Sequence, residues 1–489
     1  MSLRHLIHIV SIILLALSAA LGLTALVSLY YGDGDSPALL ACALGVALIG
    51  LLGYRTTQLE DDLSIREGYA VVSLSWLAIG IAGAAPYLAT GVLTSPTAAL
   101  FESVSGFTTT GASVFTDIEA LPHGILFWRS LTQWIGGMGI IVLGIAILPF
   151  LGVGGMQLFR AEVPGPTPER LQPRIAQTAK VLWYVYMGLT VLQVAFYLVG
   201  GMPPFEAVLH ALTTLSTGGF SPRNASIAAY DSAYIHYVTI VFMYLAGINF
   251  ALHYRALLGQ PHRYLADSEW RFFTVTLLLA TAFVLVAVLT SGHYAGAGFE
   301  RAFRDSLFQV VSIATTTGFG SYDYERWPAS PQLLLLLLMF MGGMAGSTAG
   351  GMKSIRVYVL IRHALTELKH SIHPRAVLVT RIGRRALQTG QLLNILAFIL
   401  LFFTLFAAGT LALSMTGVDP ITSIGAAASA IGNIGPGLGD VGPAENYGWM
   451  GPAPQLILVF LMLVGRLELF TVLLLFHPGL WARAGWHRH

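Results

Sequence analysis

The feature that constrains this chain most is a series of long apolar runs separated by short polar connections. A helix needs about 20 predominantly apolar residues to cross the hydrocarbon core of a bilayer. Ten runs fall in or near this range, at residues 6–30, 38–54, 68–90, 124–150, 181–200, 234–257, 272–289, 332–361, 392–415 and 455–476. The first exceeds the apolar core of a signal peptide, about 7–15 residues. We therefore predict an all-α polytopic membrane protein.

Composition excludes the main soluble classes. Only 10% of the 489 residues are Asp, Glu, Lys or Arg, whereas soluble proteins have about 25%. The formal net charge of +2 does not indicate a nucleic-acid partner. The single cysteine, Cys42, excludes an intramolecular disulfide.

The distribution of charge predicts the orientation in the membrane. Cytoplasmic connections carry an excess of Lys and Arg. With the N-terminus in the cytoplasm, 20 of the 26 Lys and Arg lie in the inner connections 55–67, 151–180, 255–271 and 353–391 or in the tails. Fourteen of the 24 Asp and Glu then lie on the outer side, where they would concentrate cations. We expect a multi-pass protein of the cytoplasmic (inner) membrane.

Four shorter apolar segments cannot cross a bilayer. They are residues 97–109, 204–216, 301–315 and 420–430, and each is followed by glycine-rich sequence. Irregular backbone at membrane depth is tolerated only where protein buries it or water lines it. We therefore predict four re-entrant segments, each a short helix and a loop.

The loops after these segments form an internal repeat. They read SGFTTTGAS (105–113), TTLSTGGFS (213–221), IATTTGFGS (313–321) and AIGNIGPGL (430–438), with Gly111, Gly219, Gly318 and Gly435 aligned. The predicted architecture is two N-terminal helices (1–60) and four helix–pore-loop–helix repeats around a pseudo-fourfold ion pore. The repeats are 61–155, 156–260, 261–370 with a broken second helix, and 371–489.

Four converging loops of this kind suit a cation-selective filter. A permeating cation can exchange its hydration shell for a ring of backbone carbonyls, and glycine reaches the required dihedral angles at low cost. Thr hydroxyls before the glycine can add oxygen ligands, although the fourth loop departs from this pattern. The candidate metal ligands are Thr109, Thr110, Gly111, Thr217, Gly218, Gly219, Thr316, Thr317, Gly318, Asn433, Ile434 and Gly435.

A candidate gate lies within the run 332–361. Five of the ten residues 342–351 are glycine, and each interior glycine costs a helix about 1 kcal/mol relative to alanine. We predict that Gly342, Gly343, Gly346, Gly350 and Gly351 break the helix and form an intramembrane gating loop. A close-packed glycine face is the alternative.

Charged residues in the apolar runs are the second candidate feature of the gate. Arg466 is predicted to line the pore, where its charge would raise the barrier to a cation; the alternative is a structural ion pair. Glu468 is a poor partner for Arg466 because residues two apart on a helix do not face each other. Arg129 is expected to snorkel to the membrane surface.

The basic connection 353–391 follows the candidate gate directly. Lys353, Arg356 and Arg362 are the predicted docking residues for a cytoplasmic partner protein. The alternative is the ordinary positive-inside signal in contact with anionic membrane lipid.

The motifs TTTGAS, STGGFS, TTTGFG, GNIGPGLG and MGGMAGSTAGGMKSIR resemble the Trk/Ktr/HKT superfamily of potassium transporters, and its bacterial TrkH branch in particular. The resemblance implies a homodimer with one pore per subunit, TrkA-type nucleotide-binding regulatory subunits, and K⁺ as transported ion with no organic cofactor in this chain. It places the four aligned glycines in the filter and an arginine matching Arg466 at the pore constriction. Because the first filter position is Gly111, it favours potassium.

We therefore expect a potassium-uptake protein and not an enzyme. A sodium-selective or cation-coupled potassium symporter of the same fold is an alternative. An intramembrane enzyme is a remote alternative, because few ionisable residues lie at membrane depth.

Overall fold

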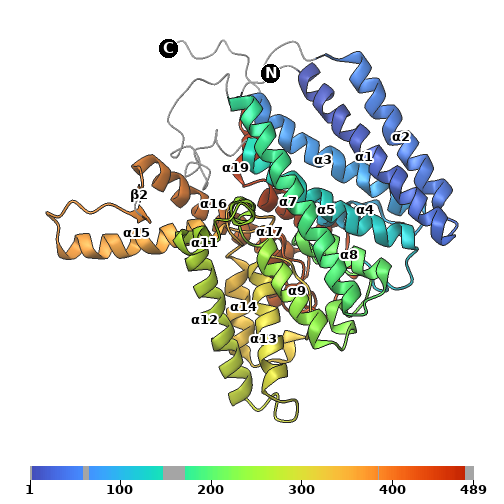
Figure 1. Ribbon diagram of the computed structural model, residues 1–489. Coiled ribbons are helices and arrows are strands. Elements are labelled where there is room, and N and C mark those ends of the chain that lie inside the picture. Colours follow the sequence, from blue (N-terminus) through green and yellow to red (C-terminus); the bar gives the residue numbers. More distant parts are fainter. Residues whose placement is uncertain (1–2, 59–64, 147–170, 384, 479–489) are drawn as a thin grey trace, which may run out of the picture.

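The computed structural model describes residues 3–58, 65–146, 171–383 and 385–478. The described residues are mostly helical, as the sequence predicts. The first two helices, α1 (Leu3–Tyr31) and α2 (Ser36–Thr56), form an antiparallel pair along one side of the molecule (Figure 1). They pack against the next long helix, α3 (Ile65–Ala89).

Six described helices are long and apolar enough to cross a membrane, judged by length and composition. Besides α1, α2 and α3 they are α7 (Leu171–Val199), α12 (Ser268–Thr290) and α16 (Thr389–Met415). Their exposed side chains include many leucines, for example Leu44 and Leu279, which are 63% and 66% exposed. Such surfaces suit contact with lipid.

Three predicted spans are broken, and only one break was expected. The run 234–257 forms α9 (Ala233–Ala246) and α10 (Phe250–Leu257), bent by 102°. The run 455–476 forms α18 (Pro452–Arg466), then α19 (Phe470–Leu473) with η4 (Leu474–Phe476), bent by 114°. Counting each bent pair as one span gives up to eight spans among the described residues.

The remaining predicted spans are partly helical. The run 332–361 contains α14 (Ala329–Met339), an irregular segment and α15 (Ser354–Ile372), so the expected break is confirmed. The run 124–150 begins as α5 (His123–Ala146), and its last residues lie outside the described part, as does most of the predicted connection 151–180.

The four predicted short helices are confirmed as α4 (Pro96–Phe107), α8 (Pro204–Leu215), α13 (Phe299–Ala314) and α17 (Pro420–Gly432). Three begin with proline, which is favoured in the first turn of a helix. Side chains cap two of them: the Ser95 hydroxyl accepts a hydrogen bond from the Ala98 amide of α4, and the Asp419 carboxylate accepts two from the first turn of α17.

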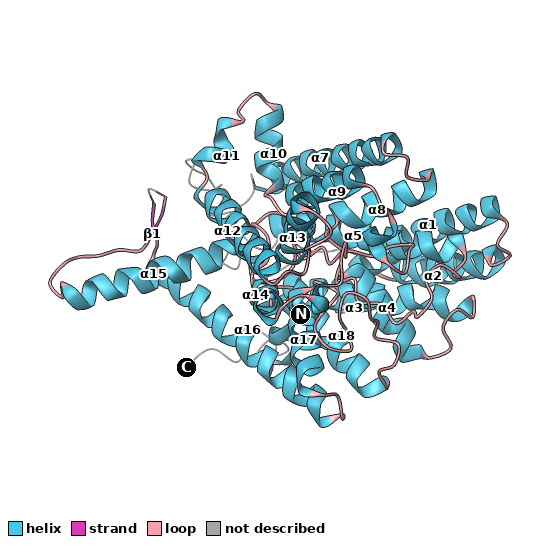
Figure 2. Cartoon of the chain, turned by 90° about the horizontal axis from the view of Figure 1, so that it is seen from below, coloured by secondary structure: helices cyan, strands magenta, loops and turns pink. Residues whose placement is uncertain are grey.

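The predicted basic connection 353–391 is mostly helix and not loop. Its first half is α15, which projects from the body of the molecule (Figures 1 and 2). Beyond it, β1 (Arg381–Ile382) and β2 (Arg385–Ala386) form a small antiparallel hairpin that pairs Arg381 with Ala386. The other short elements are α11 (His262–Ala266), η2 (Ser226–Ala229) and η3 (Tyr324–Arg326).

Candidate functional site

The four short helices end in loops with the same backbone conformation, which we call the first to fourth ring loops (107–113, 215–221, 314–320 and 431–437). Each has two residues with positive φ, two positions apart. The pairs are Thr109 and Gly111 (53° and 82°), Thr217 and Gly219 (53° and 77°), Thr316 and Gly318 (57° and 78°), and Asn433 and Gly435 (53° and 107°). Positive φ is uncommon for residues other than glycine, so its recurrence at equivalent positions indicates one shared structure.

The same hydrogen bond closes the end of each short helix. The amide of the residue before the aligned glycine donates to the carbonyl five residues earlier. The four bonds are Thr110 to Ser105 (2.9 Å), Gly218 to Thr213 (2.8 Å), Thr317 to Ser312 (2.9 Å) and Ile434 to Ser429 (3.0 Å). They satisfy carbonyls that a helix leaves without partners at its C-terminus.

The aligned glycines bring the ring loops together in cyclic order. A Cβ atom on Gly111 would overlap the carbonyl oxygen of Gly218, one on Gly219 that of Thr317, and one on Gly318 that of Ile434. A Cβ atom on Gly435 would lie 2.9 Å from the carbonyl oxygen of Thr110, which closes the ring. The twelve predicted ligand residues therefore lie in one ring, and the glycines have no room for a side chain.

The fourth ring loop keeps this backbone despite its different sequence. Asn433 takes the left-handed conformation that threonine takes in the other loops, which asparagine tolerates better than most residues. Its amide nitrogen donates to the Met462 carbonyl at 2.9 Å and to the Thr110 hydroxyl at 3.1 Å. The side chain thus connects the fourth loop to the first.

The threonine hydroxyls of the ring are mostly engaged with protein groups. Thr110 contacts Thr108 at 2.8 Å, and Thr317 contacts Thr315 at the same distance. Thr217 donates to the Ser216 carbonyl at 2.6 Å. The Thr109 hydroxyl is buried and has no hydrogen-bond partner among the described residues. Main-chain carbonyls and this hydroxyl are therefore the groups best placed to hold a cation.

The glycine-rich segment (342–351) forms a closed loop between α14 and α15. Its two ends meet where the Gly342 amide donates to the Met352 carbonyl at 2.8 Å. A Cβ atom on Gly342 would overlap the Gly350 carbonyl oxygen, so the glycines allow the two arms to approach. The segment also packs into the break between α9 and α10, where the Met344 amide donates to the Gly247 carbonyl at 2.9 Å.

The glycine-rich segment also contacts the ring directly. The Gly350 amide donates to the Thr316 hydroxyl of the third ring loop at 2.7 Å. The Thr348 hydroxyl donates to the carbonyl of Leu215, the last residue of α8, at 2.9 Å. A displacement of the segment would therefore break hydrogen bonds to two of the four quadrants.

Arg466 is buried against this segment. Its side chain is at the end of α18, 2% exposed, and donates to the Thr348 carbonyl at 2.8 Å and to the Gly136 carbonyl at 3.4 Å. Glu468 pairs instead with Arg356, in agreement with the prediction that it is a poor partner for Arg466. The chain bends sharply here because Glu468 and Leu469 both have positive φ.

Residues 38–482 match the TrkH family, described as cation transport protein. The chain belongs to the TrkH family. It is 40% identical over 487 residues to the Trk system potassium uptake protein TrkH of Vibrio parahaemolyticus serotype O3:K6, covering 98% of this chain and 100% of the relative. It is also 40% identical over 491 residues to the protein of the same name from Escherichia coli K12, with the same coverage.

A solved structure matches the whole fold. The crystal structure of the potassium transporter TrkH from Vibrio parahaemolyticus superposes with a TM-score of 0.91 at 38% identity, covering 99% of this chain and 100% of that one. These relatives are named as transporters and not as enzymes. The all-α fold of a membrane transporter is thereby established for this TrkH-family chain.

Two of the three predicted docking residues are internal in this TrkH-family structure. Lys353 is 8% exposed and its ammonium group donates to the Ala349 carbonyl. Arg356 is 3% exposed, pairs with Glu468 and lies 3.8 Å over the Phe398 ring. Because both side chains are buried, neither is accessible to a partner protein. Arg362, which is exposed, stays a candidate.

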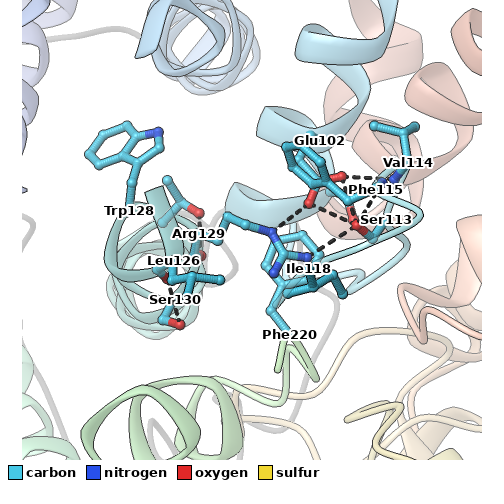
Figure 3. Close-up of polar contacts among 12 residues, drawn as sticks. Glu102, Ser113, Val114, Phe115, Ile118, Leu126, Trp128, Arg129, Ser130 and Phe220 are labelled. Carbon is cyan, nitrogen blue, oxygen red and sulfur yellow. Dashed lines mark hydrogen bonds and ion pairs between the residues drawn. The ribbon is translucent and has the colours of Figure 1, made fainter. Parts of the chain in front are cut away.

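Arg129 does not snorkel, contrary to the prediction. It is 1% exposed, and its Nε donates to Glu102 Oε1 at 2.8 Å, while Glu102 is fully buried (Figure 3). The prediction was wrong because it considered the helix of Arg129 alone. A useful signal was available: Glu102 is an acid inside a short apolar segment, and a charge there also needs a partner.

Sequence reasoning also missed Glu269, which connects the glycine-rich segment to the start of α15. Its Oε1 accepts hydrogen bonds from the Ala345 amide at 2.8 Å, the Ser354 hydroxyl at 2.8 Å and the Ile355 amide at 3.1 Å. A carboxylate can accept several bonds at once, so one side chain of α12 can make all of these contacts. No sequence spacing predicts these contacts.

The connections after the first two ring loops are joined by charged groups. Arg223 pairs with Glu206 at 2.7 Å and with Glu119 at 3.3 Å, and the Asn224 amide group donates to Asp117 at 3.0 Å. Hydrogen bonding to Glu206 raises the pKa of Arg223 above its usual value. The acids that the sequence predicts to attract cations are therefore partly neutralised here.

Proposed function

We propose that this TrkH-family protein carries potassium into the cell through the ring. The observation that carries the proposal is the closed cyclic contact of Gly111, Gly219, Gly318 and Gly435 with the carbonyls of neighbouring loops. A continuous wall of carbonyl oxygens can replace the hydration shell of a permeating cation. The relatives are named as potassium uptake proteins, which supports K⁺ as the ion.

Selectivity for potassium depends in this proposal on the geometry of the ring. The ligands in each quadrant are the groups between the first left-handed residue and the aligned glycine, including the Thr109 hydroxyl. One departure is the Gly218 carbonyl, which accepts a hydrogen bond from the Gln133 side chain at 2.6 Å. The second quadrant is thereby fixed to α5.

We propose that the glycine-rich segment is the gate. In the present arrangement it is bound to Thr316, to Leu215 and to the Arg466 guanidinium. A cationic group next to an ion pathway raises the free energy of a cation there, so Arg466 would oppose potassium while the segment is in place. Opening requires the segment to leave these partners.

The trigger in this proposal is a cytoplasmic TrkA-type regulatory subunit acting on a homodimer of this chain. The relatives belong to a named Trk system, which supports the association with further components. The route to the gate is short, because α15 projects from the body and begins directly after the glycine-rich segment (Figure 2). The proposed membrane is the cytoplasmic one, with the N-terminus inside.

The test is uptake in cells that lack their own potassium importers. Expression of the full chain with its regulatory subunit should restore growth at low external potassium and support rubidium uptake. Sodium should compete poorly; strong sodium uptake would favour the sodium-selective alternative. Absence of rescue by protein that reaches the membrane would contradict the proposal.

The gating part has a separate test. Deletion of several residues from 342–351 should give potassium flux without the regulatory subunit, because the hydrogen bonds that hold the segment are lost. Deletion of Ala295, Gly296 and Ala297, exposed residues between α12 and α13, is the matched control, since it leaves the segment intact. Flux that still required the regulator would place the gate elsewhere.

A further inference from the structure

A buried ion pair lies behind the ring loops. Glu102 on α4 and Arg129 on α5 are 0% and 1% exposed, and both lie in the interior of the protein. Such a pair stabilises little by itself, because the cost of removing two charges from water offsets their attraction. Its geometry, and not its charge alone, therefore indicates what the pair does.

Glu102 holds the chain directly after the first aligned glycine. Its Oε2 accepts a hydrogen bond from the Val114 amide at 2.9 Å, and both carboxylate oxygens lie 3.1 Å from the Ser113 hydroxyl (Figure 3). Ser113 is two residues after Gly111. The carboxylate thus fixes the first ring loop to its own short helix.

Arg129, the partner of Glu102, contacts the second ring loop. Its Nη1 donates to the Ser221 carbonyl at 3.2 Å, and its guanidinium carbon lies 4.2 Å from the centre of the Phe220 ring. Phe220 is the residue directly after Gly219. One turn along α5, Gln133 accepts from the Phe220 amide at 3.0 Å and donates to the Gly218 carbonyl at 2.6 Å.

The position of Glu102 recurs in the other quadrants with different side chains. The residues nine positions before the aligned glycines are Glu102, His210, Gln309 and Ala426. His210 contacts the Ser221 hydroxyl at 3.0 Å, and Gln309 donates to the Tyr322 carbonyl at 2.8 Å. Three quadrants therefore use this position to hold the chain after the ring. In the first the contact continues through Arg129 into the second ring loop, and in the second the His210 ring lies 5.8 Å from the Phe319 ring of the third ring loop.

We infer that the Glu102–Arg129 pair sets the spacing of the first and second ring loops and thereby the discrimination between potassium and sodium. The inference rests on the proposed function. Binding groups must be held within about 0.5 Å of their productive geometry, and a fork of fixed shape that contacts both loops meets this need. Both residues act as positioning residues, because they do not contact the ion.

The test compares relative permeabilities of the full-length protein in liposomes, together with its regulatory subunit. R129K keeps the charge but loses the fork, and the double variant E102Q/R129M removes both charges, so that no unpaired charge stays buried. In each we expect retained potassium flux and a fall in potassium-over-sodium discrimination of about tenfold, a factor equivalent to roughly 1.4 kcal/mol. R326Q, which breaks the more exposed pair with Asp323, is the matched control and should keep the original ratio.

Two results would overturn the inference. One is an unchanged permeability ratio in both variants with normal potassium flux, since the pair would then support the fold alone. The other is loss of R129K and of the double variant from the membrane, which would make the pair a requirement for folding. Absence of potassium flux in the unmodified protein is a different result, because it overturns the proposed function itself.

Discussion

Two buried arginines, Arg129 and Arg466, show how differently this protein treats the surroundings of the ring and those of the glycine-rich segment. Arg129 has a carboxylate partner and two aromatic neighbours, and it connects two ring loops. Arg466 has two main-chain carbonyls as partners, and its Nε has none among the described residues. The available carboxylate, Glu468, pairs with Arg356 instead.

The difference separates a part of the protein that must keep its shape from one that must move. A fully paired charge is expensive to disturb, because either partner alone would be an uncompensated buried charge. A guanidinium that is hydrogen-bonded to neutral carbonyls loses less interaction free energy when it moves away from them. In the proposed transporter, the ring is therefore the fixed element, and the segment beside Arg466 is the element that a regulator can shift.

The largest expected effect is on stability. Arg129→Ala should lower the free energy of unfolding by about 3–5 kcal/mol, because it leaves Glu102 buried and unpaired. Arg466→Ala should cost less, about 1–3 kcal/mol, since it removes hydrogen bonds to neutral carbonyls, and it should increase potassium flux. Thermal unfolding of the two purified variants in detergent makes the comparison. Equal losses of stability would remove the distinction between the two arginines.

The next effect is on selectivity, with a matched glycine as control. Gly111→Ala and Gly201→Ala both place a side chain at positive φ, 82° and 80°, which strains each by about 1–2 kcal/mol. Only at Gly111 does the new Cβ overlap another atom; at Gly201 nothing lies within 4 Å. Relative permeability should therefore change for Gly111→Ala and not for Gly201→Ala. Equal permeability ratios would show that the ring does not select the ion.

A smaller effect should follow from loosening the glycine-rich segment. Glu269→Gln keeps an acceptor oxygen but removes its charge, so each of the three hydrogen bonds to Oε1 should weaken, because bonds to charged groups contribute about 1.5–3 kcal/mol against about 1 for neutral ones. We expect partial potassium flux without the regulator, measured in liposomes. Glu367→Gln, at an exposed site on α15, is the control. Strict dependence on the regulator in both variants would mean that Glu269 does not restrain the segment.

The smallest effect concerns the beginning of α17. Asp419 caps this helix, and hydrogen bonding, first of all from Thr422, lowers its pKa below the usual 3.8. Its stabilisation is therefore present above pH 3.8 and lost as the pH falls through the lowered value. Asp419→Asn, which keeps a capping acceptor, should abolish this dependence on pH. Unfolding measured from pH 6 down to about pH 3 makes the test; identical pH profiles would contradict it.

Local sequence was sufficient to predict the short helices, the aligned glycines and the break after α14. Apolar length, proline at helix starts and clustered glycines act within a few residues, so they can be read along the chain. The Glu102–Arg129 pair joins residues 27 positions apart on two helices, and the Arg356–Glu468 pair joins residues 112 positions apart, so neither follows from a local pattern. The bend after Arg466 was missed for a related reason: Glu468 and Leu469 do not favour positive φ, and tertiary contacts impose it.

The cyclic order of the ring loops has a consequence for biosynthesis. The ring closes only when Gly435 meets Thr110, and Gly435 belongs to the last of the four loops. When the first three quadrants have been synthesised and inserted into the membrane, three sides of the ring are present but the pore is not closed. In the proposed transporter, an unfinished or prematurely terminated chain therefore lacks a conduction path, and the cell is protected from a potassium leak during synthesis.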